Sequence, residues 1–452
     1  MLSRLGWGFY GVGSALLTAT AAPFFLLRRG GRYRGSVLPR LGWPGGDETS
    51  APGAGVGGLW IHAVSVGEVG VARTLVSALP PNLPLVITTV TPTGQGLARK
   101  AFGDRAAVTY LPFDVGLSVR RFFRRYQPRA LVLVEGDLWP RVLREAHRHG
   151  LSRTVVNGRI SDRSFARLNR LGSVATWYYQ QVDQLGVQTE DDRQRLLRLG
   201  LAEERVQVTG NLKFDTAEPK RNLDLEKAVE LWAAARPVVV AGSTMAGEEE
   251  QVLDAWRVAG GSRSLLMLAP RHPERFDAVA RLLAQQGVRF ERRSESRDID
   301  SREAGAPASP KNRAPEVVLL DTLGELATLY RNATLAFVGG TLVPTGGHNP
   351  IEPARFGIPV SVGPSMENFR EIAVLFEAAE AWGQAPDAET LGAMWKGWLD
   401  DSAARAEVGR RSRELVASHR GATQRTLALL EPVLEPLMEA LPETPPGDGG
   451  LE

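Results

Sequence analysis

The sequence contains no cysteine among its 452 residues. Disulfide bonds, thiolate metal sites and a cysteine nucleophile are therefore excluded. The six histidines do not show the spacing of metal ligands, and neither a Walker phosphate-binding loop nor a GxGxxG fingerprint after the first expected strand is present. We therefore expect no metal ion and no cofactor, and hydride transfer and Walker-type phosphoryl transfer are disfavoured.

A strong charge imbalance and short repeats are also lacking. The formal net charge is only +3 with neutral histidines, so bulk electrostatics do not predict a nucleic-acid partner. No short-period repeat is visible, which argues against a solenoid. Apolar residues make up 43% and charged residues 23% of the chain, which is the composition of an ordinary globular protein. A chain of this length predicts two domains.

A long stretch without any charged residue runs from Leu5 to Leu27. As a helix it would be roughly 34 Å long, enough to cross a bilayer core. A cleavable signal peptide is the alternative, because Ala19-Thr20-Ala21 resembles a cleavage site. The stretch is followed by five arginines: Arg28, Arg29, Arg32, Arg34 and Arg40. This positive flank favours an uncleaved anchor over residues 1–43, with the body of the protein in the cytoplasm and the arginines on anionic headgroups of the membrane surface.

Short apolar runs alternate with helical patterns after a Gly- and Pro-rich linker at residues 44–58. The first series has expected strands at 59–63, 85–90, 130–134, 154–156, 184–187 and 206–208. A polar helix at 223–235 precedes the second series, at 237–241, 265–268, 317–320, 334–338 and 358–362. This alternation is typical of parallel sheets covered on both faces. We expect an α/β protein with two Rossmann-like domains, 59–220 and 221–435, facing a cleft, and a disordered tail at 436–452.

The second series contains the stretch FVGGTLVPTGGHNPIEPARFGIPVSVG, residues 337–363. Its loop carries four glycines: Gly339, Gly340, Gly346 and Gly347. We expect them to free backbone amides for a phosphate. Asn349-Pro350 begins a short helix that Gly357 ends in the left-handed conformation, and Glu352 in its first turn is placed to bind a ribose hydroxyl. The alternative is a tight turn that only packs the helix on the sheet.

Two acidic residues follow strands of the first series. In WIHAVSVGE, Glu68 lies at a helix start, where the helix dipole lowers a carboxyl pKa. A general base there needs partial burial as an offset, and a plain helix cap is the equal alternative. In VEGDLWP, Glu135 is placed to hold substrate or a cation, whereas Asp137 is expected to be an N-cap.

Basic and hydroxyl side chains also end strands. The segments NGRISDRS and GNLKFD bring Arg159 and Lys213 to the rim that carries the two glutamates, which suits a phosphorylated or carboxylated substrate. In the second series, Ser243 and Thr244 supply hydroxyls at a helix start. Arg271 follows another strand, where its guanidinium can pair with a phosphate.

The segments WIHAVSVGE, TTVTPTG, YLPFD, EGDLWP, VTGNLKFD, APRHPERF and GGHNPIEPARFGIPV occur in this order. Over about residues 32–432 the chain resembles 3-deoxy-D-manno-octulosonic acid (Kdo) transferases. The resemblance implies a GT-B fold, CMP-Kdo as donor, a lipid A precursor as acceptor, and an anchor in the inner membrane. It implies Glu68 as catalytic base and a CMP-binding set: Pro270, Arg271, Leu323, Gly324, Glu325, Asn349, Pro350, Ile351 and Glu352.

We take Glu135 as a second catalytic candidate. Further substrate contacts are expected from Arg159, Lys213, Ser243, Thr244, Gly346, Gly347 and His348. In the expected inverting mechanism, Glu68 deprotonates an acceptor hydroxyl that attacks Kdo, and Arg271 and helix amides offset the charge on departing CMP without a metal ion.

The sequence departs from the family pattern at three places. Gly136 stands where Thr is usual, Met245 where His is usual, and Ser365-Met366-Glu367 where HTF is frequent. Acceptor preference and the number of Kdo residues added are therefore left open. Two alternatives are a GT-B transferase with a UDP-linked donor and an inactive lipopolysaccharide-binding scaffold.

Overall fold

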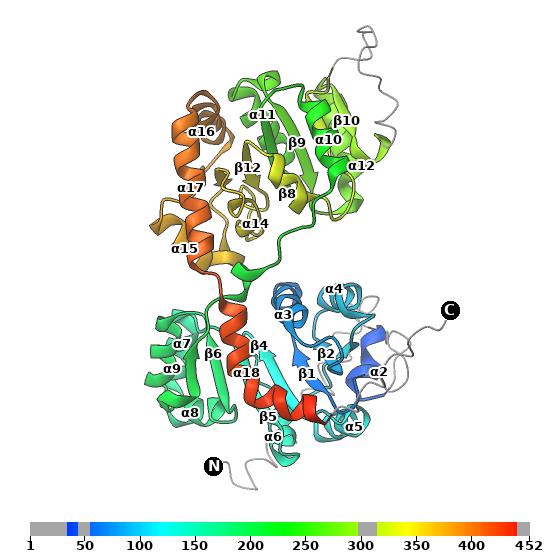
Figure 1. Ribbon diagram of the computed structural model, residues 1–452, viewed down its shortest axis with the longest axis vertical. Helices are drawn as coiled ribbons and strands as arrows, with labels where there is room; N and C mark the ends of the chain where they lie inside the picture. Colours follow the sequence, from blue (N-terminus) through cyan, green and yellow to red (C-terminus); the bar gives the residue numbers. More distant parts are fainter. Residues whose placement is uncertain (1–33, 44–54, 297–313, 441–452) are drawn as a thin grey trace, which may run out of the picture. The chain divides into compact units, whose positions relative to one another are not determined.

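The computed structural model describes residues 34–43, 55–296 and 314–440. The chain divides into two units: unit 1 comprises residues 1–216 and 420–452, and unit 2 comprises residues 217–419 (Figure 1). Each unit is built on its own seven-stranded sheet. The expected span Leu5–Leu27 lies outside the described residues, and no helix within the described part of the chain is long and apolar enough to cross a membrane.

Unit 1 has the strand order β3-β2-β1-β4-β5-β6-β7, with every pair parallel. Its strands are β1 (Leu59–His62), β2 (Leu85–Thr89), β3 (Ala107–Tyr110), β4 (Ala130–Val134), β5 (Ser152–Gly158), β6 (Gln184–Val187) and β7 (Val206–Val208). Its helices are α2 (Val37–Arg40), α3 (Val66–Ala78), α4 (Pro92–Phe102), α5 (Gly116–Tyr126), α6 (Pro140–Arg148), α7 (Asp162–Arg170), α8 (Ser173–Tyr179), α9 (Glu190–Arg198) and α18 (Ala422–Glu439). Strand β1 is buried on both faces, because Leu59 and Ile61 enter one core and Trp60 the other.

Unit 2 repeats this plan with the order β10-β11-β9-β8-β12-β13-β14, again all parallel. Its strands are β8 (Val238–Thr244), β9 (Leu265–Pro270), β10 (Phe290–Arg292), β11 (Val317–Leu319), β12 (Leu335–Val338), β13 (Val360–Val362) and β14 (Gly383–Gln384). Its helices are α10 (Leu223–Ala233), α11 (Glu249–Val258), α12 (Phe276–Gln285), α13 (Leu326–Leu329), α14 (Ile351–Ala354), α15 (Arg370–Ala378), α16 (Ala388–Asp400) and α17 (Ser402–Ser418). Two buried clusters again cover the sheet, with Val239 in one and Val240 in the other.

The C-terminal helix α18 belongs to unit 1, where it lies beside β5 and β6 (Figure 1). Leu430 and Leu437 are buried in a core of that unit, and Asp215 fixes the helix start because its Oδ1 accepts a hydrogen bond from Gly421 N at 2.8 Å. The predicted end of the second domain at residue 435 is therefore wrong, as is a tail from 436, since the helix continues to Glu439. Apolar periodicity identifies such a helix but does not say which core it covers.

The first described residues are also part of unit 1. Arg40, predicted to face headgroups, lies over the rings of Tyr110 and Phe113 at 5.0 and 5.7 Å. Gly57, in the predicted linker, donates its amide to Tyr126 O at 2.9 Å. The predicted anchor region at 1–43 and the predicted linker at 44–58 therefore both extend too far toward the C-terminus. Arg40 and Gly57 already make contacts within the folded unit.

Candidate active site

Both sheets contain a topological switch point, at which successive strands stop being added on one side of the first strand and are added on its other side. In unit 1, β1 is followed outward by β2 and β3, and the chain then returns to place β4 on the other side of β1. In unit 2, the same reversal separates β8 from β12. Ligands of open parallel sheets bind at the carboxyl ends of the strands beside such a switch point. Glu68 follows β1 and Glu135 follows β4, so unit 1 carries both predicted acids at its switch point.

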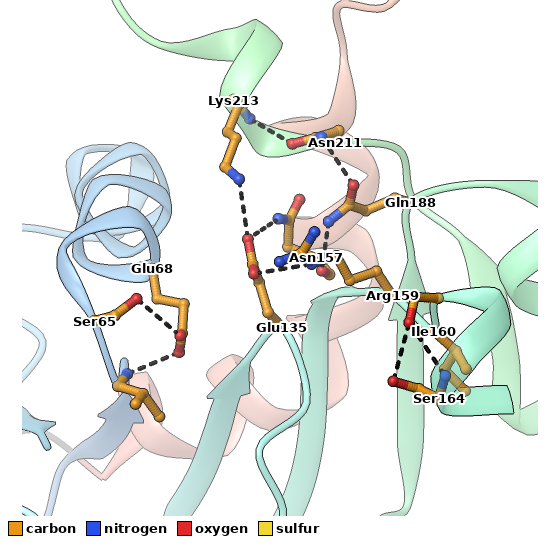
Figure 2. A network of polar contacts seen from close by, with 12 residues as sticks. Ser65, Glu68, Glu135, Asn157, Arg159, Ile160, Ser164, Gln188, Asn211 and Lys213 are labelled. Atoms are coloured by element: carbon orange, nitrogen blue, oxygen red, sulfur yellow. Dashed lines mark hydrogen bonds and ion pairs between the residues drawn. The ribbon is translucent and has the colours of Figure 1, made fainter. Parts of the chain in front are cut away.

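Glu68 lies in the first turn of α3, as predicted. Its carboxylate accepts hydrogen bonds from Val64 N at 2.7 Å and Ser65 Oγ at 3.2 Å, which fix its direction (Figure 2). Burial raises the pKa of Glu68 to about 7; the negative charges of Glu135 and Asp137 add to this, against the lowering by the bond from Val64 N. The burial that a base at this position requires is therefore present. A carboxyl that titrates near neutrality can accept a proton during turnover.

Glu135 has a left-handed backbone, with φ of 59°, an uncommon conformation for a residue with a side chain. Its carboxylate contacts Lys213 Nζ and Arg159 Nε, each at 3.2 Å, and accepts a 3.4 Å hydrogen bond from Asn157 Nδ2. Figure 2 shows these contacts converging on one carboxylate. The structure thus brings together the predicted residues Glu135, Arg159 and Lys213. Because both cations pair with the Glu135 carboxylate, Glu135 is suited to positioning Arg159 and Lys213.

Sequence reasoning missed a group of amide side chains that supports this cluster. Asn157 Oδ1 accepts from Leu212 N at 2.9 Å, Gln188 Nε2 donates to Asn157 O at 3.0 Å, and Asn211 Nδ2 donates to Gln188 Oε1 at 2.8 Å. Asn157 is left-handed at φ of 55°, which Asn tolerates well. The Asn-Gly pair at the end of β5 was the available signal, but no local pattern marks Gln188.

The expected N-cap role of Asp137 is wrong. Helix α6 begins only at Pro140, and its N-cap residue is Trp139. The first amides of this helix are bound by Asp114, which accepts from Arg141 N at 3.1 Å and from Val142 N at 3.0 Å. A residue distant in sequence therefore caps the helix. The negative charge of Asp137 makes a small contribution to the raised pKa of Glu68.

The switch point of unit 2 brings Ser243 and Thr244, at the end of β8, against the loop that follows β12. A Cβ atom on Gly339 would lie 2.4 Å from Ser243 O, so only glycine fits there. Ser243 is left-handed at φ of 58°, and Thr244 Oγ1 donates to Glu249 Oε1 at 3.3 Å. The two predicted hydroxyls are thus placed at the switch point.

The glycine-rich loop does not leave its glycine amides open, in contrast to the sequence expectation. Gly340 N donates to Glu248 Oε2 at 2.6 Å and Gly346 N to Ser365 Oγ at 2.9 Å. Gly347 N donates to Gly340 O at 2.8 Å, and Gly339 N also bonds to a backbone oxygen. These glycines permit close packing of the loop on itself, because a Cβ on Gly340 would lie 3.1 Å from the His348 ring.

Arg271 lies directly after Pro270, the last residue of β9. Its side chain is exposed, and it forms no ion pair with another described residue. Burial lowers the pKa of His348 to about 4, and the positive charge of Arg271 contributes. The imidazole is therefore neutral at physiological pH, which leaves Arg271 as the group that can offset the charge of a phosphate.

The predicted segment Leu323–Glu325 lies after β11. The Leu323 side chain is 65% exposed, and Gly324 has φ of 90°. The Glu325 carboxylate accepts from Arg293 Nη2 at 3.0 Å and from the Thr322 hydroxyl. This segment can therefore offer an apolar surface and a backbone turn, while its carboxylate is already paired.

The segment Asn349–Glu352 forms the start of α14. Asn349 Oδ1 accepts from Ile351 N at 3.1 Å, and Asn349 Nδ2 donates to Glu352 Oε1 at 3.4 Å. Pro350 is the N-cap residue, and Gly357 is left-handed at φ of 71°, as predicted. Asn349 thus fixes both the helix start and the direction of the Glu352 carboxylate.

The model of the family described as 3-deoxy-D-manno-octulosonic-acid transferase (kdotransferase) matches residues 35–216. The 3-deoxy-D-manno-octulosonic acid transferase of Haemophilus influenzae is 35% identical over 413 residues, 89% of this chain and 92% of the relative. That of Bordetella pertussis is 36% identical over 417 residues, 89% of this chain and 93% of the relative. This chain belongs to the Kdo transferase family. It is a glycosyltransferase, and the resemblance seen in its motifs is confirmed.

Solved structures support the architecture of this Kdo transferase. The UDP-GlcNAc 2-epimerase from Neisseria meningitidis bound to UDP-GlcNAc has a TM-score of 0.52 at 11% identity, covering 83% of this chain and 99% of that chain. A glycosyltransferase from Rickettsia africae has a TM-score of 0.50 at 12% identity, covering 85% and 100%. At such identities the likeness establishes the fold alone. The expected α/β architecture with two Rossmann-like sheets is confirmed.

Proposed function

We propose that this Kdo transferase moves Kdo from CMP-Kdo to a lipid A precursor with inversion at the anomeric carbon, in the inner core of lipopolysaccharide. The observation that carries the proposal is Glu68, whose carboxyl group has a pKa raised to about 7 at the switch point of unit 1. A base of this pKa suits the deprotonation of a sugar hydroxyl near neutral pH. Family membership supports the choice of sugar.

The proposed reaction is a single displacement. Glu68 takes the proton of the acceptor hydroxyl while its oxygen forms a bond to the anomeric carbon of Kdo. The bond from that carbon to the phosphate oxygen breaks, and CMP leaves with the electron pair. Attack from the face opposite to CMP inverts the configuration. The nearby cations Arg159 and Lys213, held by Glu135, can bind a carboxylated or phosphorylated substrate group.

Unit 2 binds the donor in this proposal. Arg271 offsets the phosphate charge of CMP, supported by its exposure and by the neutral His348 beside it. The Ser243 hydroxyl adds a donor near the end of β8, whereas the Thr244 hydroxyl already donates to Glu249. Glu352, directed by Asn349, accepts hydrogen bonds from the ribose hydroxyls.

Replacing Glu352 tests the ribose contact. Glu352→Ala leaves the ribose hydroxyls to water, so we expect CMP binding to weaken by about 1.5–3 kcal/mol, the range for hydrogen bonds to a charged partner. This is roughly a ten- to hundredfold rise in the dissociation constant. Calorimetric titration with CMP measures it. Glu389→Ala is the matched control, because Glu389 lies in the first turn of α16 in the same unit. Unchanged CMP affinity in both variants would show that Glu352 only stabilises the start of its helix.

Donor turnover tests the whole proposal. The purified full-length chain is incubated with CMP-Kdo, with and without lipid A precursor, and in parallel with UDP-linked sugars. We expect release of CMP only when the lipid A precursor is present. Release of UDP would instead indicate a UDP-sugar transferase, and absence of any release would indicate an inactive lipopolysaccharide-binding scaffold.

We propose in addition that Leu5–Leu27 anchors the protein in the inner membrane and that both units lie on the cytoplasmic side. The uncharged length of this stretch and the arginines after it support the proposal. Deletion of residues 1–28 should leave a folded chain that binds CMP and no longer sediments with membranes, because the strands of both sheets begin at Leu59 or later. Loss of the cooperative unfolding transition in the truncated chain would show that the stretch is part of the fold.

A further inference from the structure

Glu248, at the N-cap of α11, has a fully buried carboxylate with four backbone N–H donors around it. Oε1 accepts from Thr341 N and Leu342 N, both at 2.8 Å. Oε2 accepts from Gly340 N at 2.6 Å and from Met245 N at 2.8 Å. No cation of the described residues pairs with it. Backbone amides therefore compensate this buried charge, and three of them belong to the loop after β12.

The contacts of Glu248 extend to the predicted donor-binding segment. Gly340 N donates to the carboxylate, and Gly340 O accepts from Gly347 N at 2.8 Å. Gly347 immediately precedes His348 and Asn349, and Asn349 directs the Glu352 carboxylate at 3.4 Å. The Glu248 carboxylate thus fixes residues 340–342 of the loop. The hydrogen bond from Gly347 N to Gly340 O then fixes the position of Gly347 relative to them.

We propose that Glu248 is a positioning residue that holds the loop 339–349 in the conformation that binds the nucleotide of the donor. The inference rests on the proposed function, because it takes CMP as the ligand of this loop. Glu248 does not itself contact the donor, since all four of its hydrogen bonds go to the backbone. Its effect on binding is exerted through the placement of Asn349 and Glu352.

Glutamine is not an equivalent residue at this position. Each carboxylate oxygen serves two N–H donors. The amide of Gln has one accepting oxygen, and its NH₂ group is a donor. Two buried N–H groups would then face another donor without an acceptor, so the loop must move or open. Aspartate keeps both oxygens and the charge but has a shorter reach, and it should disturb the loop less.

The experiment compares Glu248→Gln, Glu248→Asp and wild type by calorimetric titration with CMP and by steady-state kinetics with CMP-Kdo. Because a displacement of about 1 Å can cost about 100-fold, we expect Glu248→Gln to raise the CMP dissociation constant and the KM for CMP-Kdo at least about tenfold. The KM for the acceptor should stay unchanged, and Glu248→Asp should lie between wild type and Gln. A role in folding alone would lower the melting temperature without changing these constants in the folded protein.

Asp401→Asn is the matched control, because Asp401 also accepts two backbone N–H groups in unit 2, at the start of α17. This variant should bind CMP like wild type. Normal CMP affinity in both Glu248 variants would overturn the inference while leaving the proposed donor intact. Failure of the wild-type chain to bind CMP would overturn the proposed donor and the inference with it. If Glu248→Gln does not fold, the CMP dissociation constant and the KM for CMP-Kdo of Glu248→Asp test the inference. Wild-type values of both constants in Glu248→Asp would then overturn it.

Discussion

Glu68→Gln is expected to reduce turnover by about 10²- to 10⁴-fold, the usual contribution of general-base catalysis. Glutamine keeps the size of the side chain, and its oxygen can still accept the hydrogen bond from Val64 N, but it cannot take a proton from the acceptor. CMP affinity should stay nearly unchanged, because unit 2 binds the donor in our proposal. A loss confined to kcat, with the donor KM retained, is the signature of a group that acts in the chemical step.

A stability measurement separates this result from simple misfolding. The pKa of Glu68 is raised by burial from 4.5 to about 7, so the stability that its proton provides is complete below about 4.5 and is lost as the pH rises through about 7. Glu68→Gln carries no such loss, and at pH 8 we expect it to melt no lower than wild type. Glu145→Gln serves as a control, since Glu145 is buried in unit 1 on α6 and should keep full turnover. Near wild-type activity in Glu68→Gln would remove Glu68 from the mechanism.

The pH dependence of turnover is the second large expected effect. Only the ionised carboxylate of Glu68 can act as a base, and its pKa is raised to about 7. Turnover should therefore fall about tenfold for each pH unit below about 7 and reach a plateau above it. The change reverses on return to high pH, because it reflects one proton and not unfolding. Rate profiles under saturating donor and acceptor measure this effect.

Asp137→Asn tests the electrostatic origin of that profile. The negative charge of Asp137 contributes to the raised pKa of Glu68, so its removal should move the acidic limb to lower pH while the plateau rate stays similar. Arg163→Gln is a suitable control, because Arg163 is exposed on α7. An unshifted limb in Asp137→Asn would mean that another group governs the pH dependence.

The fold could largely be read from the sequence, and the omissions share a physical cause. Every central strand was predicted, but β3, β10 and β14 were not, and all three lie at sheet edges. An edge strand pairs on one side only and needs no long apolar run. Strand β10 reads FER and β14 only GQ, and neither carries the periodicity that identifies a strand. Most residues of helix α18 were assigned to the second domain, whereas they belong to unit 1. The sequence did not show this, because an apolar pattern is local and the packing of a helix is not.

The site divides in the same way between local and distant contacts. The positions of Glu68 and Glu135 followed from strand ends and helix starts, because the carboxyl ends of parallel strands share one edge. Glu135 and Lys213 are far apart in sequence but form an ion pair. The sequence predicted that both lie at the carboxyl edge of the first sheet, but it did not predict the ion pair. Glu248 was not singled out, because its three partners in the loop after β12 lie more than 90 residues away.

The most direct test of the central claim is a titration of Glu68 itself. Wild type and Glu68→Gln are prepared with glutamate labelled by ¹³C at the side-chain carboxyl, and the resonance present only in wild type is followed from pH 4 to pH 9. We expect a midpoint near 7, from the burial-raised pKa. A midpoint near the ordinary value of 4.5 would contradict the assignment of Glu68 as a base poised for catalysis at neutral pH.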